Sequence, residues 1–238
     1  MPEISIITVC LNDKIGLERT IQSVLAQNFT DIEFFIIDGG SSDGSLDVLK
    51  KYSNRITNWV SEKDNGIYDA MNKGISKSRG RYCLFLNAGD YLAEENVLEE
   101  FYKWGRKEDI VYGDMILKTK DNKETLMKSP DSVSIRRMLV DTIWHPVSFI
   151  KRTLFENYGP YNLQFKIVAD YEFFVRTIIK EEVTTFHIPK VIAVFDDSGI
   201  SSNMNNRDAL IKERNQVQDL YFNRFLLYCF RLYSKWRN

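Results

Sequence analysis

Through the first hundred residues, short runs of apolar and β-branched residues alternate with segments whose apolar residues recur every three or four positions. The runs predict four buried strands, at 4–9, 33–37, 56–60 and 82–86. The periodic segments between them predict helices at about 17–25, 46–52 and 67–77. This alternation predicts an α/β fold with a mostly parallel, Rossmann-like sheet flanked by helices and right-handed crossovers.

The pattern changes after residue 104, where the predicted elements become shorter and less regular. The first of these are a helix, two strands and a hairpin turn, at 96–104, 110–112, 115–119 and 120–123. A partly buried helix and two extended pieces follow, at 168–179, 184–188 and 191–195. The last thirty or so residues predict one long helix. We therefore divide the chain into three parts, 1–104, 105–205 and 206–238.

Composition narrows the class of protein. With 44% hydrophobic and 27% charged residues, the chain is typical of a soluble globular protein. Its net charge of -1 gives no basic field of the kind that attracts nucleic acid. The three cysteines are far apart, which argues against a disulfide framework or a zinc site. The chain enters a strand directly after Met1, and no apolar run reaches 18 residues, so we expect a cytoplasmic protein without a signal peptide.

Carboxylates follow two of the predicted strands directly. Asp38 ends the second strand, and Asn87-Ala88-Gly89-Asp90 follows the fourth. Ligands of open α/β sheets collect outside the carboxyl ends of the strands. A carboxylate beside small residues at that edge suits a divalent cation that carries a phosphorylated ligand. The alternative is a polar turn after a core strand.

Two common phosphate-binding motifs are absent, and a third motif is weak. No glycine precedes Gly16 after the first strand, and no P-loop follows any strand. Gly40–Gly44 matches the G-x-S-x-G elbow of α/β-hydrolases, and Asp170 and His187 follow in the order of a triad. Because the elbow usually comes late in its sheet, a hydrolase remains only a minor alternative.

Seven segments resemble family 2 glycosyltransferases of the GT-A fold: 4–9, 21–27, 36–45, 61–74, 86–90, 169–173 and 199–201. The similarity extends over about residues 3–202. It implies inverting transfer of a sugar from a nucleotide-diphosphate donor, with a UDP-sugar expected, to a glycan or lipid-linked acceptor in bacterial surface polysaccharide synthesis. It also implies a nucleotide-sugar-binding half at 1–104 and an acceptor-binding, catalytic half at 105–205.

The resemblance implies that polar residues of the first half bind the donor: Thr8, Asn12, Asp38, Asp64, Asn72 and Asn87. In the family, the counterpart of Asp38 accepts hydrogen bonds from the base. The residues themselves leave other roles open. Asp and Asn after a strand also start turns, and acidic residues also cap helices.

The resemblance implies a divalent cation, Mn²⁺ or Mg²⁺, bound by Asp90. The usual family motif is Asp-x-Asp, whereas this chain has Asn87 and a single carboxylate. Asn87 can still supply an oxygen ligand or bind the ribose. Because the departure puts strict metal dependence in doubt, a catalytically silent nucleotide-sugar-binding protein is kept as the alternative function.

Asp170 matches the family's catalytic carboxylate at the head of a later helix, although Ala169 stands where many members have Glu. We interpret Asp170 as the general base, with Glu172 as the second candidate. His145 lies in a loop, where it either serves the acceptor or metal or has only a structural role. His187 lies in an apolar extended run and is expected to be packed.

The C-terminal tail, 220–238, contains four basic and no acidic residues among many aromatic ones. Such a helix can lie in a membrane interface. It can equally pack on its own domain or on a second subunit of a homodimer. The first interpretation would place the protein peripherally on the inner face of the plasma membrane.

Overall fold

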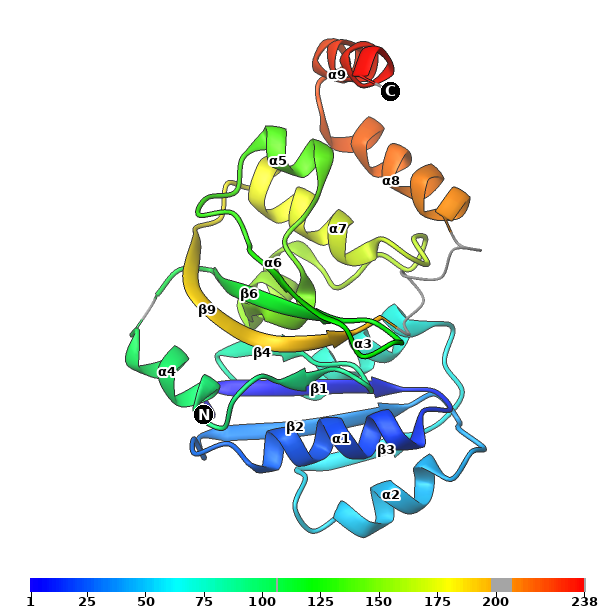
Figure 1. The fold of residues 1–238 in the computed structure, drawn as a ribbon, viewed down its shortest axis with the longest axis vertical. Coiled ribbons are helices and arrows are strands. Elements are labelled where there is room, and N and C mark those ends of the chain that lie inside the picture. The colour runs from blue at the N-terminus through cyan, green and yellow to red at the C-terminus, as the bar shows by residue number, and fades with distance from the viewer. Residues whose placement is uncertain (106, 198–206, 238) are drawn as a thin grey trace.

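The computed structural model describes residues 1–105, 107–197 and 207–237, with side chains up to residue 232. Figure 1 shows one sheet crossing the middle of the molecule, with α2 toward one end and α9 at the other. The described elements form a single sheet of nine strands, in which β3-β2-β1-β4-β8-β6-β9-β5 lie side by side and β7 pairs with β6.

The first half is regular. Its elements are β1 (Ile4–Cys10), α1 (Lys14–Leu25), β2 (Ile32–Asp38), α2 (Ser45–Tyr52), β3 (Asn58–Ser61), α3 (Ile67–Lys77) and β4 (Tyr82–Phe85). All four strands pair in parallel. The predicted alternation is confirmed, with the third strand two residues later at its start than expected.

The second half extends the same sheet in mixed directions. β5 (Tyr91–Leu92) and α4 (Val97–Lys103) complete the first half. The elements of the second half, up to the sheet's last strand, are β6 (Ile110–Lys118), β7 (Glu124–Met127), α5 (Ile135–Val140), a 3₁₀ turn (His145–Val147), β8 (Ser148–Lys151), α6 (Arg152–Tyr158), α7 (Ala169–Phe174), a π-helical turn (Val175–Lys180) and β9 (Thr185–Asp196). β8 is antiparallel to β4 and β6, while β9 is parallel to β6. The predicted α/β class is confirmed.

Two pairs of predicted short strands are in fact two long strands. The break expected near Gly113 lies inside β6, and the break expected at Pro189 lies inside β9. The β6–β9 register shifts between Tyr112 and Met115, and this irregularity accommodates the proline. A Cβ on Gly113 would lie 2.4 Å from the Ile192 side chain, so glycine is required for the close approach.

The predicted single terminal helix is wrong. The structure has α8 (Arg207–Tyr221) and α9 (Arg224–Arg237), which meet at an elbow. Asn223 creates the break, because its side-chain oxygen accepts the backbone N–H of Phe225 at 2.9 Å and starts a new helix. Among the described residues, no helix is long and apolar enough to cross a membrane.

The sheet separates two hydrophobic clusters, and β1 contributes to both. Ile7 and Val9 pack on one face with Met71 of α3, whereas Ile4 and Ile6 pack on the other face with residues of α1. This period of two, with burial on both faces, explains the nearly continuous apolar run of the strand. The packed layers fix the carboxyl ends of β1 and β4 beside each other.

Candidate active site

A cavity of about 320 Å³ opens at the carboxyl ends of β1 and β4. Both halves of the chain line it. The first half supplies the polar residues Asp13, Asp64, Tyr68, Asn87 and Asp90, and the second half supplies His145, Lys166, Asp170 and Asp196. Five of the ten sequence-predicted site residues therefore meet here, four of them being Asp64, Asn87, Asp90 and Asp170. His145, predicted to lie near the acceptor or metal, joins them.

The first wall of the cavity is shaped by local turns. Asp13 caps α1 by accepting the N–H of Gly16 at 2.9 Å, and Asp64 accepts the N–H of Gly66 at 3.0 Å. A Cβ on Gly39 would come within 2.4 Å of the Asp64 carboxylate. Glycine at that position therefore lets Asp64 lie against the strand end.

Asp38 and Asn12 hold the neighbouring loop 39–43. Asp38 is fully buried and accepts hydrogen bonds from the N–H groups of Gly40 and Ser41 and from the Ser61 hydroxyl. Asn12 accepts the N–H of Ser42 at 2.8 Å. Neither is among the residues that line the cavity. Their contacts with the donor stay a prediction.

Thr8 and Asn72 lie away from the cavity lining. The buried Thr8 hydroxyl donates to the carbonyl of Leu86 at 2.6 Å and so joins β1 to the end of β4. The Asn72 amide donates to the carbonyl of Tyr161 at 2.9 Å and accepts its N–H at 3.0 Å. These bonds give both residues a structural role, which the sequence did not distinguish from donor binding.

Asp90 lies buried in the wall of the cavity. Its Oδ1 accepts the N–H of Asp196 at 3.1 Å, and burial raises the pKa of its carboxyl group to about 7. Arg19 stabilises this corner by donating to the carbonyl of Gly89 and to Asp196 Oδ2, both at 2.6 Å. Arg19 and Asp196 are functional candidates that the sequence patterns missed.

The residues around Asp90 fit a cation that is shared with a diphosphate. Among the described residues, no three His, Cys, Asp or Glu are arranged to hold a metal by themselves. The Oδ1 of Asn87 is a buried acceptor with no partner in the described part of the chain. Mg²⁺ is commonly held by one or two carboxylates together with substrate phosphates. Asp90 and Asn87 match that donor set.

Asp170, the second residue of α7, lines the cavity from the second half of the chain. Its carboxylate accepts hydrogen bonds from Tyr68 at 2.8 Å, from His145 at 2.9 Å and from the N–H of Tyr171 at 2.9 Å. Burial by itself would raise the pKa of Asp170, but the bonds from His145 and Tyr68 outweigh it and lower the pKa. At neutral pH Asp170 is therefore a carboxylate, able to accept a proton.

His145 connects Asp170 to the first half of the chain. Because its Nδ1 faces the Asp170 carboxylate, Nδ1 carries the proton. The Nε2 atom then accepts from the Asn87 side-chain amide at 3.1 Å. With this assignment the Asn87 amide nitrogen bonds His145, and the Asn87 amide oxygen is the buried acceptor that has no partner in the described part of the chain. A continuous chain thus runs from Asp170 through His145 to Asn87.

The comparisons with known proteins identify the family of the chain. The sequence model of Glycosyl transferase family 2 matches residues 5–167. The chain belongs to this family. A "PGL/p-HBAD biosynthesis glycosyltransferase" of Mycobacterium bovis is 32% identical over 209 residues, which cover 85% of this chain and 80% of that protein. The family resemblance and the assignment as a glycosyltransferase are confirmed.

Two solved structures share the fold of this glycosyltransferase. Staphylococcus aureus TarS 1–349 in complex with UDP-GlcNAc gives a TM-score of 0.68 at 16% identity, over 84% of this chain. This chain spans 59% of that one. The mannosyltransferase PcManGT of Pyrobaculum calidifontis, in complex with GDP-Man and Mn²⁺, gives 0.64 at 15% identity, over 82% of this chain and 56% of that one. Both confirm a GT-A-like structure.

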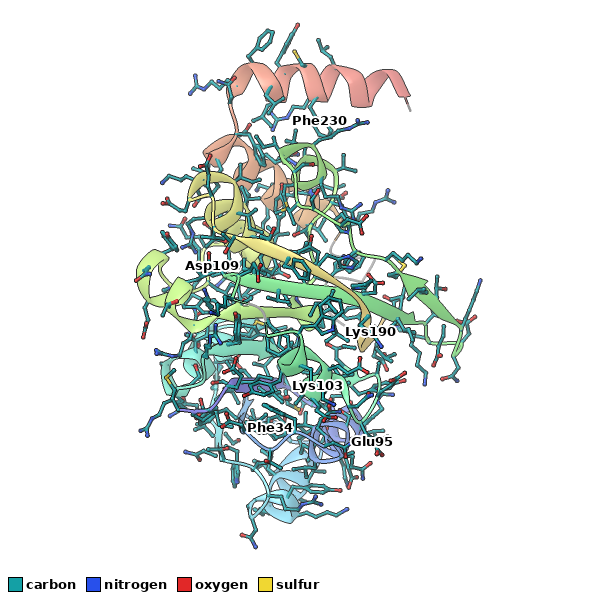
Figure 2. All side chains as sticks on the ribbon, turned by 90° about the vertical axis from the view of Figure 1, so that its left-hand side faces the viewer. Phe34, Glu95, Lys103, Asp109, Lys190 and Phe230 are labelled. Atoms are coloured by element: carbon teal, nitrogen blue, oxygen red, sulfur yellow. The ribbon has the colours of Figure 1, made fainter. Side chains whose placement is uncertain are left out.

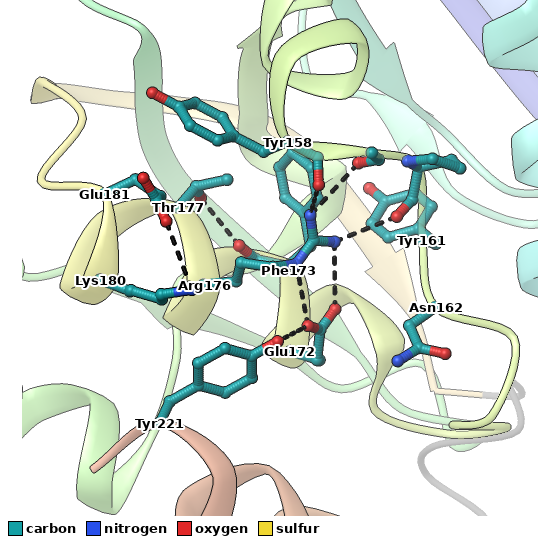
Figure 3. A network of polar contacts seen from close by, with 12 residues as sticks. Tyr158, Tyr161, Asn162, Glu172, Phe173, Arg176, Thr177, Lys180, Glu181 and Tyr221 are labelled. Atoms are coloured by element: carbon teal, nitrogen blue, oxygen red, sulfur yellow. Dashed lines mark hydrogen bonds and ion pairs between the residues drawn. The ribbon is translucent and has the colours of Figure 1, made fainter. Parts of the chain in front are cut away.

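Glu172 does not reach the cavity of the glycosyltransferase. Figure 3 shows its carboxylate facing Arg176 and the Tyr221 hydroxyl. Glu172 is only 1% exposed, and Arg176 also donates to backbone carbonyls near Tyr158. Glu172 lies two residues after Asp170, and two positions on a helix point in different directions. Its role as second candidate base is therefore corrected to a structural one.

The hydrolase alternative is also wrong. His187 pairs with Asp114 at 2.8 Å rather than with Asp170, whose histidine partner is His145. His187 is buried in β9, as predicted for a packed residue. The glycine-rich segment around Ser42 forms the turn that Asp38 and Asn12 hold together.

The loop before α7 owes its position to α8. Glu213 accepts the N–H groups of Lys166, Ile167 and Val168 at 2.9, 2.9 and 3.2 Å. The first N–H groups at a helix start have no partner within the helix, so this carboxylate satisfies donors next to Asp170. No motif signalled it, because Glu213 lies 43 positions after Asp170 along the chain.

Proposed function

We propose that this glycosyltransferase transfers a sugar, with inversion, from a UDP-sugar to a glycan or lipid-linked acceptor in bacterial surface polysaccharide assembly. One observation carries the proposal. A buried carboxylate from the first half, Asp90, and an ionised one from the second, Asp170, line the same cavity. The two carboxyl groups would serve two different tasks of the reaction, leaving-group stabilisation and proton removal.

The first task concerns the departing nucleoside diphosphate. As the bond between the anomeric carbon and phosphate oxygen breaks, negative charge develops on the diphosphate. Asp90 and the Asn87 oxygen would hold Mn²⁺ or Mg²⁺, which neutralises this charge when bound. The structure of PcManGT with GDP-Man and Mn²⁺ supports a metal in this fold. The complexes of TarS with UDP and UDP-GlcNAc support a UDP-sugar as donor.

The second task is removal of a proton from the acceptor. As the acceptor hydroxyl oxygen bonds to the anomeric carbon, its proton passes to Asp170. His145 and Tyr68 orient the carboxylate by donating to its two oxygens. Inversion requires that the acceptor, beside Asp170, and the diphosphate, beside Asp90, lie on opposite faces of the transferred sugar.

The proposal is tested by thermal shift and nucleotide release. A panel of UDP- and GDP-sugars is screened with and without Mn²⁺, since ligands that bind the native state raise its melting temperature. We expect a UDP-sugar to give the largest shift with Mn²⁺, and slow release of UDP through donor hydrolysis. Asp90→Asn should reduce the Mn²⁺-dependent shift, whereas the exposed control Asp47→Asn on α2 should not.

The silent-binding alternative predicts a different result. A protein that only binds nucleotide sugars would show the same shifts but release no nucleotide with any donor or acceptor. Equal Mn²⁺ responses of Asp90→Asn and the wild type would remove Asp90 from the metal site. A larger shift with GDP-sugars would correct the donor base.

A further inference from the structure

The helix α9 presents an apolar stripe to solvent at the end of the molecule farthest from α2 (Figure 1). Phe225, Tyr228 and Leu232 are 75%, 62% and 51% exposed. Their spacing of three and four residues places them on one face of the helix. Cys229 lies on the same face and is also exposed. Exposed apolar residues that lie together indicate an interaction surface, whereas scattered ones do not.

The opposite face of α9 attaches the helix to the body. Leu227 is buried and Phe230 packs against the same core cluster. Figure 2 shows Phe230 on the side of α9 that faces the rest of the molecule, while other side chains project outward. The stripe is therefore left over after α9 has made its own packing contacts. Packing on its own domain, one of the two interpretations of the tail, accounts for only one face.

The charge of the tail differs from that of the rest of the chain. Residues 220–238 hold four of the 32 basic and none of the 33 acidic residues, so they carry +4 of a net charge of -1. The remainder accordingly carries -5. A two-fold contact between the tails of two copies would bring positive charges together, which costs free energy. An anionic surface would instead be attracted.

Cationic and apolar groups meet in the elbow between α8 and α9. A hollow of about 510 Å³ there is lined by Arg224, Arg231, Tyr228 and Leu232, together with Leu227 and Asp219. Arg231 pairs with Asp219 at 2.8 Å, and Arg224 is exposed. Arginine binds phosphate groups well, and Tyr prefers the boundary between water and lipid. This combination suits a phospholipid, which presents a phosphate group next to apolar carbon atoms.

We propose that α9 docks the enzyme on an anionic lipid surface, with its stripe in the interface and Arg224 at the headgroup phosphates. The helix lies in the plane of the membrane, as amphipathic basic helices do. The donor cavity and Asp170 take no part in this binding. The test of lipid binding is therefore independent of the test of the sugar transfer proposed above.

The test is cosedimentation of the full chain with vesicles. Phosphatidylcholine vesicles containing phosphatidylglycerol are compared with pure phosphatidylcholine at low and high salt. We expect binding to the anionic vesicles, weaker binding at high salt because salt screens exposed charges, and little binding to the neutral ones. Soluble inorganic phosphate at the same phosphate concentration should not displace the protein, because it lacks the apolar part.

Matched variants separate the stripe from apolar exposure in general. Phe225→Ser, Tyr228→Ser and Leu232→Ser together should lower vesicle binding by about tenfold or more, because three apolar side chains no longer enter the interface. Ile15→Ser, Leu126→Ser and Val140→Ser together remove exposed apolar groups from other faces and should leave binding unchanged. Arg224→Glu should weaken binding more than Arg136→Glu, which changes an exposed arginine of α5.

Several results would overturn the proposal. One is a full chain that ignores anionic vesicles, and another is a stripe variant that binds them as well as the wild type while keeping its melting temperature. A concentration-dependent dimer in light scattering that the stripe substitutions abolish, without vesicle binding, would assign the stripe to a second copy instead. Unchanged nucleotide-sugar shifts in the variant would confirm that the catalytic part is intact.

Discussion

The two walls of the cavity, which we propose receive the donor and the acceptor, are built in different ways. On the donor wall, Asp13 and Asp64 are held by N–H groups two or three residues away along the chain. On the acceptor wall, Asp170 is held by Tyr68 and His145, which lie 102 and 25 positions away. Apart from Asp90, which accepts the N–H of Asp196, the donor wall is therefore specified by local turns, whereas the acceptor wall depends on the assembled fold.

This difference has a functional meaning. Because Asp13, Asp64 and Asp90 all come from the first hundred residues, and only Asp196 reaches this wall from the second half, donor binding should tolerate changes on the acceptor wall. Because the acceptor wall is joined to α3 through Tyr68 and Asn72, its geometry should respond to changes in either half. The following predictions test this separation.

The largest effect is expected for Asp170→Asn. Asparagine keeps the size and most hydrogen bonds of the side chain but cannot accept a proton. Loss of a general base typically lowers the rate about 10²- to 10⁴-fold. Transfer should be lost while the thermal shift with the nucleotide sugar survives. Near wild-type transfer by this variant would show that the base lies elsewhere.

Glu172→Gln should affect stability instead of chemistry. Removing one partner of a buried ion pair typically costs about 3–5 kcal/mol, because Arg176 is left buried without its counter-charge. Urea unfolding measures this loss, and the rate per folded molecule should be unchanged. Glu181→Gln, in the same helical segment, breaks the exposed contact with Lys180 and should cost well under 1 kcal/mol. A rate loss without destabilisation would restore Glu172 as a catalytic candidate.

His145→Ala should slow transfer by about tenfold to a hundredfold. A hydrogen bond to a charged group is worth about 1.5–3 kcal/mol, and here it orients the Asp170 carboxylate. His145→Asn, whose amide can donate to Asp170, should recover part of the rate. The control His187→Ala also removes a buried histidine and should lower stability without lowering the rate of the folded enzyme. Equal rates for His145→Ala and wild type would exclude the orienting role.

Asn72→Ala should loosen the connection between the halves. It leaves the N–H and carbonyl of Tyr161 without their partner, which costs about 1–3 kcal/mol of stability. Ser76→Ala, an exposed change on the same helix, should cost almost nothing. Donor affinity should be retained if Asn72 is structural. A selective loss of donor affinity at unchanged stability would support the donor-binding role predicted from the sequence.

The smallest effect concerns acid stability. The native pKa of Asp170 lies below its ordinary value of 3.8, so its ionised form stabilises the fold above that pH. This contribution is lost as the pH falls through the native pKa. The stability difference between wild type and Asp170→Asn should therefore be smaller at pH 3.5 than at pH 6 in urea titrations. If the stability difference instead grew as the pH fell, the pKa of Asp170 would be raised in the native state rather than lowered.

The sequence predicted the regular half of the fold well and the irregular half poorly. From Ile4 to Phe85, strand and helix periods are strong because β1, β2 and β4 are buried on both faces. Glycine and proline ordinarily indicate breaks in strands, but β6 continues through Gly113 and β9 through Pro189. The irregular register between the two strands accommodates both residues. Local signals could not reveal this, because the compensation comes from a strand more than 70 residues away.

The same limit applies to the site. Asp64, Asn87, Asp90 and Asp170 could be found because each stands at an element end within a recognisable motif. Asp196 and Arg19 could not, since their importance follows from an ion pair between β9 and α1. Thr8 and Asn72 are residue types that commonly bind ligands, but they lie inside β1 and α3, and their polar atoms are directed to backbone partners.

The hydrogen bonds that Glu213 accepts limit how much of the C-terminal part of this enzyme can be removed. The family match ends at residue 167, and the sequence pattern suggests a tail from 206. Cutting at either position would remove the carboxylate that the three N–H groups before Asp170 require. We expect the smallest independently active form to extend through Tyr221, whose hydroxyl also reaches Glu172. We therefore expect the catalytic unit to end after α8, beyond both of these boundaries.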